Sequence, residues 1–428
     1  MTVLRGVPTS SGVGFGGIGA GVVVAGDLTP AEAQALDPAA VTAVVTAGGA
    51  PLSHASILLR TSGIPAVSGL GGELLGLPPG TVVLVDGDAG TVRVAPSPGE
   101  LEAARARARD TRRGQDEARA LAGDPATTLD GHRVEVLTNV GSPADTRLAV
   151  GEGADGVGML RTEFVFLGRS QPPDEEEQYL AYRAVADALG DRPLVVRTLD
   201  LGADVPVWDG PAEPNPALGN RGIRLTLGRP DLLETQLRAI ARLASDRPLG
   251  VMFPMVTTVD ELRRARACLT SAARRAPRAS LHVGITVEVP ATALTAEVFA
   301  PGVDFLAVGT NDLTQYTLAV DRANAAVAAL ADGMHPAVLR LVRSVTAAAD
   351  RHGRAVCVVG ELASDPLAVP LLLGLGVGSL SVRPNAVPTV KQAVRAAAVE
   401  EARAVAEAAL HAESAPAVRE LAARRWGR

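Results

Sequence analysis

Eight short apolar runs, separated by amphipathic stretches, constrain the fold of this 428-residue chain more than any other feature. Amphipathic helical patterns lie between most of them, for example at 231–245 and 337–353. Eight strand-then-helix units in roughly 300 residues predict an α/β protein built on a (β/α)8 TIM barrel. An open doubly wound sheet stays an alternative, because periodicity alone does not show closure. The runs occupy residues 134–140, 156–160, 194–199, 250–256, 283–289, 305–309, 355–360 and 378–382.

The residues before this pattern are organised differently. They contain β-like runs at 21–26, 40–49, 81–90 and 91–96, with one helical stretch at 53–62. The tract DGDAG between the last two runs predicts a hairpin turn. Residues 100–122 are rich in Ala, Arg and Glu, which predicts a solvated helix. We therefore expect a small β/α domain over 1–99, a helical linker over 100–124 and the barrel over 125–428.

Charge and composition exclude several classes of protein. The chain has 47 acidic and 41 basic residues and a net charge of −6, which argues against a nucleic-acid binder or a membrane-surface protein. Cys268 and Cys357 are far apart, which argues against a disulfide scaffold or a cysteine zinc site. No targeting or membrane-spanning stretch is present, so we expect a soluble, cytoplasmic protein. The basic residues are all Arg except Lys391.

Polar residues gather where the predicted strands end. In a barrel the carboxyl ends of the strands form one face, and chemistry takes place there. Arginine forks bind phosphate and carboxylate oxygens, and Glu288 with Asp312 could hold Mg²⁺ against a phosphate. The alternative is that these charges only pair with one another. The residues at these positions are Arg161, Arg197, Arg221, Arg224, Glu288, Asn311, Asp312, Arg322 and Glu361.

His54 is a second candidate site. A Gly-Gly turn leads through residues 51–53 to His54 at the start of a predicted helix. Free backbone N–H groups and the positive end of the helix could stabilise a phosphoryl group on a ring nitrogen. An isolated histidine at a helix start is more often a cap or a packing residue, and spacing alone does not decide between the two.

Several long motifs resemble those of the phosphoenolpyruvate-utilising enzymes, and most closely enzyme I of the bacterial sugar phosphotransferase system. The segment GGAPLSHASILLRTSGIPAV (48–67) is similar to the phosphohistidine signature of that family, with His54 at the phosphorylated position. The barrel motifs are GVGMLRTEFVF (156–166), VVRTLDLGAD (195–204), NPALGNRGIR (215–224), MFPM (252–255), VGTNDLTQYTLAVDR (308–322), HPAVLRLV and GELASDPLAVPLLLGLG. The resemblance covers nearly the whole chain.

The resemblance implies a swivelling phosphohistidine domain that carries a phosphoryl group from phosphoenolpyruvate to a phosphocarrier protein, releasing pyruvate and serving sugar transport. It also implies a homodimer that forms through the barrel. By motif match, Arg197 would be catalytic, and Glu288 and Asp312 would bind Mg²⁺. The residues that would bind phosphoenolpyruvate are Arg161, Arg197, Arg221, Asn311 and Arg322.

One departure from the family pattern concerns the proton donor. The family has a cysteine directly before the Gly-Glu of the seventh-strand motif, where it protonates the methylene carbon of enolpyruvate. Val359 stands at that position, and valine cannot transfer a proton. Cys357 lies two residues earlier, on the same strand face but about 6.5 Å deeper, and is the remaining thiol candidate. We therefore expect slow turnover, or a proton from another source.

A second departure concerns the carrier protein. Enzyme I inserts a carrier-binding helical subdomain into its phosphohistidine domain, whereas residues 7–21 run directly into VVVAGDLTPAEAQALDP in this chain. Two hypotheses follow. The chain is a phosphoenolpyruvate-dependent phosphotransferase, which the intact His54 signature favours. Alternatively, it is a catalytically impaired, regulatory paralogue that binds phosphoenolpyruvate, which Val359 and the absent subdomain favour.

Overall fold

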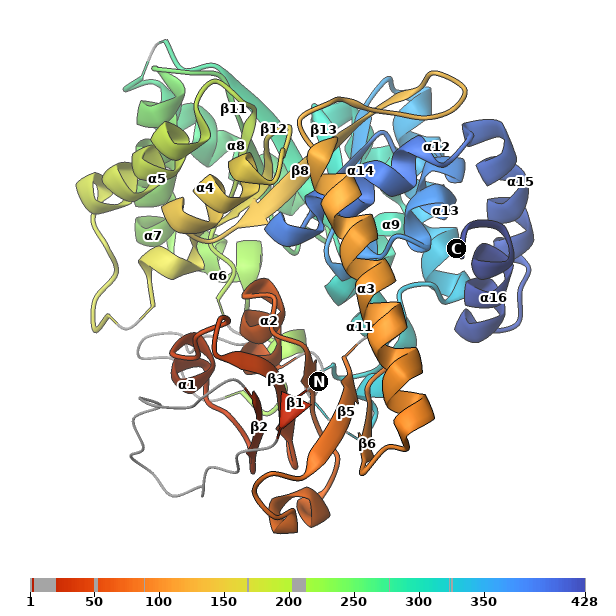
Figure 1. The fold of residues 1–428 in the computed structure, drawn as a ribbon. Coiled ribbons are helices and arrows are strands. Elements are labelled where there is room, and N and C mark those ends of the chain that lie inside the picture. The colour runs from red at the N-terminus through yellow and green to blue at the C-terminus, as the bar shows by residue number, and fades with distance from the viewer. Residues whose placement is uncertain are drawn as a thin grey trace. The chain divides into compact units, whose positions relative to one another are not determined.

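The computed structural model of the chain describes residues 2–3, 21–49, 53–87, 89–167, 169–201, 213–276, 278–322, 324 and 326–427; the side chains of residues 30, 54, 57, 60 and 61 lie outside this description. The chain forms two compact units (Figure 1). One comprises Met1–Glu117 and Leu318–Ala331, and the other comprises Ala118–Thr317 and Asp332–Arg428. The predicted domain boundaries at 99 and 124 stay predictions.

The second unit is a closed barrel of parallel strands. Each strand pairs in parallel with the next one along the chain. The last strand pairs with the first, with Leu380 opposite Val136, so the sheet has no free edge and the TIM-barrel prediction is confirmed over the open sheet. The strands are β8 (Arg133–Val140), β9 (Val157–Arg161), β10 (Leu194–Arg197), β11 (Leu249–Phe253), β12 (Leu281–Val287), β13 (Phe305–Gly309), β14 (Ala355–Val359) and β15 (Ser379–Val382).

Helices cover the outside of this barrel, and α5, α7 and α8 lie side by side (Figure 1). Capping boxes at Asp174 and Thr258 satisfy free backbone N–H groups at the starts of α5 and α8. The helices are α4 (Pro143–Gly151), α5 (Glu175–Leu189), α6 (Gly222–Gly228), α7 (Pro230–Ala244), α8 (Val259–Ala273), α9 (Pro290–Leu294), α10 (Ala296–Phe299), α11 (Thr310–Leu318), α12 (Pro336–Arg351), α13 (Ala368–Gly374), α14 (Val387–Arg395), α15 (Val399–Leu410) and α16 (Ala415–Trp426).

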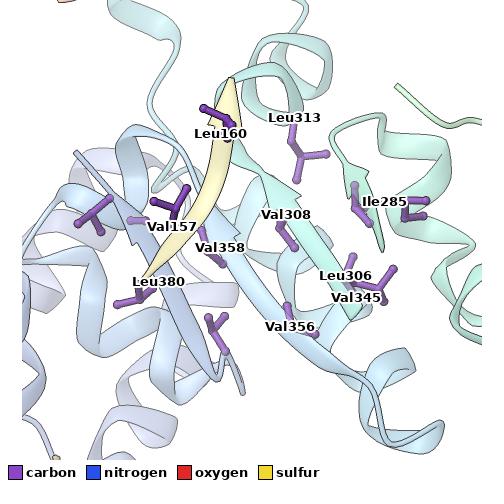
Figure 2. Close-up of a cluster of buried hydrophobic side chains, with 14 of the residues drawn as sticks. Val157, Leu160, Ile285, Leu306, Val308, Leu313, Val345, Val356, Val358 and Leu380 are labelled. Atoms are coloured by element: carbon purple, nitrogen blue, oxygen red, sulfur yellow. The ribbon is translucent and has the colours of Figure 1, made fainter. Parts of the chain in front are cut away.

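The main core lies between the strands and these helices. Strand β14 shows the alternation: Val356 and Val358 point outward into the main core, where Val345 of α12 also lies (Figure 2). The side chains of Cys357 and Val359, at the alternate positions, face the barrel interior. The interior therefore has an apolar layer below the carboxyl ends of the strands, formed by Met159, Met252, Ala307 and Val359.

The first unit contains two small sheets. Strands β2 (Gly21–Ala25), β3 (Val41–Thr46) and β4 (Ala66–Val67) are parallel, and they pack against α1 (Pro30–Gln34) and α2 (His54–Thr61). Strands β1 (Thr2–Val3), β5 (Val82–Asp86) and β6 (Thr91–Val94) are antiparallel. The predicted hairpin is confirmed by the pairing of Asp86 with Thr91.

Helix α3 (Pro98–Ala120) corresponds to the predicted solvated helix. Ala118 is its one buried residue, and the chain that follows is fixed to the barrel by Lys391, which is fully buried. The Lys391 ammonium donates to the carbonyl of Ala122 at 3.0 Å and to Asp155 Oδ1 at 2.9 Å. Within the described residues, no helix is long and apolar enough to cross a membrane.

Candidate active site

The carboxyl ends of the barrel strands bring four of the predicted residues together. Arg197 is the last residue of β10, Glu288 directly follows β12, and Asp312 lies in the first turn of α11, which follows β13. Arg221 reaches the same place from the start of α6. Because these strands are parallel members of one closed barrel, their carboxyl ends lie on the same face.

Arg221 is the most enclosed cation of this group, with 3% of its surface exposed. Its Nη2 and Nε donate to the carboxylate of Asp200 at 2.8 and 3.0 Å, and Nη1 lies 3.4 Å from Asp312 Oδ1. Nη1 also donates to the Tyr316 hydroxyl at 3.1 Å. Two carboxylates and a phenol thus hold the guanidinium in one orientation, as a buried charge requires.

The backbone next to Arg221 depends on a glycine. Gly222 has a φ of +58°, a conformation that side chains other than glycine rarely adopt. A Cβ at this position would lie 2.9 Å from the side chain of Met255, so a larger residue would also collide with the neighbouring loop. The backbone conformation and the close Met255 side chain therefore explain the glycine at position 222 of the NPALGNRGIR motif.

Arg197 forms a second cationic centre beside the first. Its Nη2 donates to Glu163 Oε1 at 3.0 Å, and its Nη1 lies 3.3 Å from Asp200 Oδ2. Asp200 therefore pairs with both Arg197 and Arg221. The Nε of Arg197 is buried and has no hydrogen-bond partner among the described residues, so this donor is available to a ligand.

Glu288 is a buried carboxylate with an unusual environment. Its Oε1 accepts the backbone N–H of Met255 at 2.7 Å, and Met255 itself has a φ of +58°. Burial, and then the negative charges of Asp312 and Asp200, raise the pKa of Glu288 to about 8. A Cβ at Gly309 would lie 2.9 Å from Glu288 Oε2, so glycine is needed there to make room for the carboxylate.

The donor set at Glu288 and Asp312 fits a divalent cation. Carboxylate oxygens are the hard ligands that Mg²⁺ prefers, and the pKa of Glu288 is raised first by burial and then by the neighbouring carboxylates. Among the described residues, no group of three or more His, Cys, Asp or Glu side chains is arranged to hold a metal ion. The set therefore fits Mg²⁺ bound by few protein ligands together with substrate oxygens.

Asn311 and Glu361 lie on another part of the same face. Asn311 Oδ1 accepts the backbone N–H of Glu361 at 2.9 Å, which ties the start of α11 to the loop after β14. Glu361 Oε2 lies 3.4 Å from Arg383 Nε, an ion pair without hydrogen-bond geometry. Arg383 follows β15, and our sequence analysis did not include it.

The barrel interior separates Cys357 from these residues. Val359 packs in the apolar layer, 2% exposed, and Cys357 lies two residues farther from the carboxyl end of the strand. Burial raises the pKa of the Cys357 thiol to about 12. A neutral thiol beneath an apolar layer is poorly placed to exchange protons with a substrate at the carboxyl face.

Other predicted residues are not brought into this group. Arg161 ends β9 as an exposed residue with its own interactions, and Arg322 belongs to the segment Leu318–Ala331 of the first unit. Arg224 donates to Thr257 Oγ1 at 2.6 Å. His54 is the first residue of α2, and its side chain lies outside the described residues, as does the junction at 7–20.

Ser53, directly before His54, caps the start of α2. The Ser53 hydroxyl accepts the backbone N–H of Ser56 at 3.3 Å, as a helix cap does. A capping role for His54 is therefore not needed to explain where α2 begins.

The network contains residues that our sequence analysis missed. Asp200, Glu163 and Tyr316 orient the two buried arginines, and Met255 binds Glu288 through its backbone. Asp200 and Glu163 lie inside the motifs quoted above, directly after strands β10 and β9, so strand-end position was a usable signal for both. A backbone N–H gives no such signal in a sequence.

Comparisons with known proteins agree with this architecture. Residues 115–399 match the family model described as the PEP-binding domain of PEP-utilising enzymes, and residues 19–90 match their mobile domain. The chain is 46% identical over 409 residues to the multiphosphoryl transfer protein of Xanthomonas campestris pv. campestris, covering 95% of this chain and 49% of that protein.

Two further relatives are phosphoenolpyruvate-protein phosphotransferases. That of Haloferax volcanii is 44% identical over 412 residues, and that of Haemophilus influenzae is 38% identical over 408 residues; each alignment covers 94% of this chain and 71% of the relative. The chain spans about half the length of the multiphosphoryl transfer proteins that it matches. Both parts of the chain match, and the chain belongs to the family of phosphoenolpyruvate-utilising enzymes.

Proposed function

We propose that the chain is a phosphotransferase that moves a phosphoryl group from phosphoenolpyruvate to His54 and then to a histidine of a phosphocarrier protein. In the first step the bond between phosphorus and the enol oxygen breaks and a bond from phosphorus to a ring nitrogen forms. The leaving enolate takes a proton on carbon and becomes pyruvate. The observation that carries this proposal is the buried group of Arg197, Arg221, Glu288 and Asp312.

The two buried arginines would neutralise the substrate charges. Phosphoryl transfer needs positioning and charge stabilisation more than covalent chemistry from the protein. Arg197 and Arg221 are fixed by carboxylates before substrate arrives, so little reorganisation is needed when charge develops. Arg161, Asn311 and Arg322 would complete the phosphoenolpyruvate site by their positions in the family motifs.

Glu288 and Asp312 would hold Mg²⁺, which when bound neutralises phosphate oxygens. Both side chains are at least nine-tenths buried, and their mutual repulsion supports a role as cation ligands. Glu288 keeps one oxygen on the Met255 N–H, which fixes the direction of its carboxylate.

Val359 supports one alternative function. A side chain without an exchangeable proton, packed in an apolar layer, favours a regulatory paralogue that binds phosphoenolpyruvate and turns over poorly. The names of the relatives favour the enzyme. A cytoplasmic location, a role in sugar transport and a homodimer are further parts of the proposal, supported by the resemblance of the motifs.

The test is to incubate the purified chain with Mg²⁺ and phosphoenolpyruvate labelled in its phosphate. We expect acid-labile label on His54, lost in His54→Ala and kept in His411→Gln, a matched change at an exposed histidine. Label that persists in His54→Ala would overturn the site assignment. Measurable phosphoenolpyruvate binding without label would favour the regulatory alternative.

A further inference from the structure

Arg419 joins three separate parts of the barrel domain. It lies on α16, the last helix, and its Nε and Nη2 donate to the two carboxylate oxygens of Asp332 at 2.7 and 2.9 Å. Its Nη1 donates to Asp365 Oδ2 at 2.9 Å. A single guanidinium thus uses both edges of its fork on two carboxylates that are far apart in the chain.

Each of these carboxylates also shapes its own turn. Asp332 Oδ1 accepts the backbone N–H of Met334 at 2.9 Å, just before α12 begins. Asp365 Oδ1 accepts the backbone N–H of Leu367 at 3.0 Å, between the short helix η6 (Glu361–Ser364) and α13. Arg419 binds the other oxygen of Asp365 and both oxygens of Asp332, so Asp332 Oδ1 accepts from Arg419 as well as from Met334. Arg419 therefore fixes two turns at once.

The two turns also contact each other. A Cβ at Gly333 would lie 3.3 Å from the side chain of Leu362, so the turn after Asp332 packs closely on η6. Helix α16 is anchored to the barrel next to Arg419, because Val418 is fully buried in the main core.

The turn at Asp365 leads directly to a residue of the proposed site. Helix η6 begins at Glu361, whose N–H binds Asn311 Oδ1 at 2.9 Å. Ser364, at the end of η6, accepts the backbone N–H of Arg383 at 3.1 Å.

We infer that Arg419 is a positioning residue for phosphoenolpyruvate binding, acting through Asp365 and η6 on Asn311, with the Asp332 turn packed against η6. This inference rests on the proposed function. Arg419 acts indirectly: it binds Asp365, and the η6 helix just before Asp365 donates the Glu361 N–H to Asn311. Without it, two carboxylates would face each other without a shared cation, and the turns would separate.

The test compares three variants of the full chain by single-turnover phosphorylation of His54 at a series of phosphoenolpyruvate concentrations. For Arg419→Met we expect the half-saturating concentration of phosphoenolpyruvate (the apparent KM) to rise about tenfold while the maximal labelling rate changes less than about twofold, because substrate binding and not chemistry is disturbed. Arg419→Lys keeps the charge but not the two-edged guanidinium, and should recover part of the lost phosphoenolpyruvate binding. Arg424→Met is the control and should match wild type, because Arg424 is an exposed residue of the same helix whose Nη2 donates to Glu420 at 2.6 Å.

Hydrogen exchange gives a readout that does not depend on activity. We expect faster exchange of the Met334, Glu361 and Leu367 amides in Arg419→Met, with the centre of α16 unchanged. Unchanged KM with unchanged exchange at these amides would overturn the inference. Faster exchange confined to α16 would also overturn it, since Arg419 would then only anchor its own helix. If wild type does not label at all, the proposed function fails, and the exchange comparison still decides whether Arg419 fixes the two turns.

Discussion

The carboxyl face of the barrel has two sides that are built differently. On one, which we call the buried side, Arg221, Glu288 and Asp312 are buried, the Arg197 side chain is 12% exposed, and Asp200 pairs with both arginines. On the other, which we call the loop side, Asn311, Glu361 and Arg383 are half-buried. Glu361 and Arg383 form an ion pair there, with 3.4 Å between Oε2 and Nε.

The two sides show two ways in which a protein can fix binding residues before the substrate arrives. The buried side is rigid because each charge is satisfied by another charge or by the backbone, and low local polarity strengthens these interactions. The loop side depends on turns that are fixed from outside by Arg419. We therefore expect changes on the buried side to abolish function and changes on the loop side to weaken substrate binding.

The largest effect should come from Arg221→Met. Loss of a preorganised cation should lower phosphorylation of His54 on the order of a thousandfold. Asp200 and Asp312 would remain buried without this partner, so the free energy of unfolding should fall by about 3–5 kcal/mol. Initial labelling rates and urea denaturation measure the two effects.

The control for Arg221 is Arg229→Met. Arg229 pairs with Asp231 at the surface, at 3.2 Å, and such a pair contributes less than about 1 kcal/mol. Equal stability losses in the two variants would show that the buried side is not the rigid part of the face.

Glu288→Gln should have the next largest effect on activity. The amide keeps the size of the side chain but removes a cation ligand, so we expect phosphorylation to fall roughly a hundredfold and to respond less to added Mg²⁺. Titration of the labelling rate with Mg²⁺ measures this. A Mg²⁺ response equal to that of wild type would contradict the proposed ligand role.

The same variant tests the pH dependence of the buried side. The pKa of Glu288 is raised in the folded protein, so its stabilising contribution is present in full below its unfolded pKa of about 4.3 and is lost as pH rises through about 8. Metal-free wild type should therefore lose stability relative to Glu288→Gln between pH 6 and pH 8.5. Denaturation of both proteins at the two pH values measures the difference, and a constant difference would contradict the raised pKa.

Val359→Cys should raise turnover. A thiol at this position would lie at the carboxyl end of β14, nearer the substrate than Cys357, and general acid catalysis contributes about 10²–10⁴-fold where it is optimised. We expect at least about a tenfold rise in pyruvate formation with little change in the first labelling of His54. Equal pyruvate formation in both proteins would show that protonation does not limit the reaction.

Cys357→Ala should have the smallest effect, less than about twofold on pyruvate formation. Its pKa of about 12 keeps the thiol neutral at pH 8, so wild type should also react very slowly with iodoacetamide at this position. Mass spectrometry of the alkylated peptide measures the reaction. Rapid alkylation, or loss of turnover in the alanine variant, would show that Cys357 reaches the substrate.

The sequence was a good guide to the strands and to the residues at their ends. Apolar runs predicted all eight barrel strands, and strand-end position predicted Arg197, Glu288 and Asp312. The contacts between them could not be predicted, because they depend on how loops from different strands meet. Asp200 bridges two arginines, and Arg419 joins turns 33 residues apart in the chain, neither of which leaves a periodic pattern.

Lys391, which fixes the chain after α3, is the only lysine in the sequence, and its amine is fully covered. A reagent that acylates lysine therefore finds no target in the folded barrel. The rate of acylation of Lys391 would therefore measure how often this part of the barrel opens to solvent. The barrel thus carries a single-lysine reporter of local opening, bonded to the chain just after the long helix.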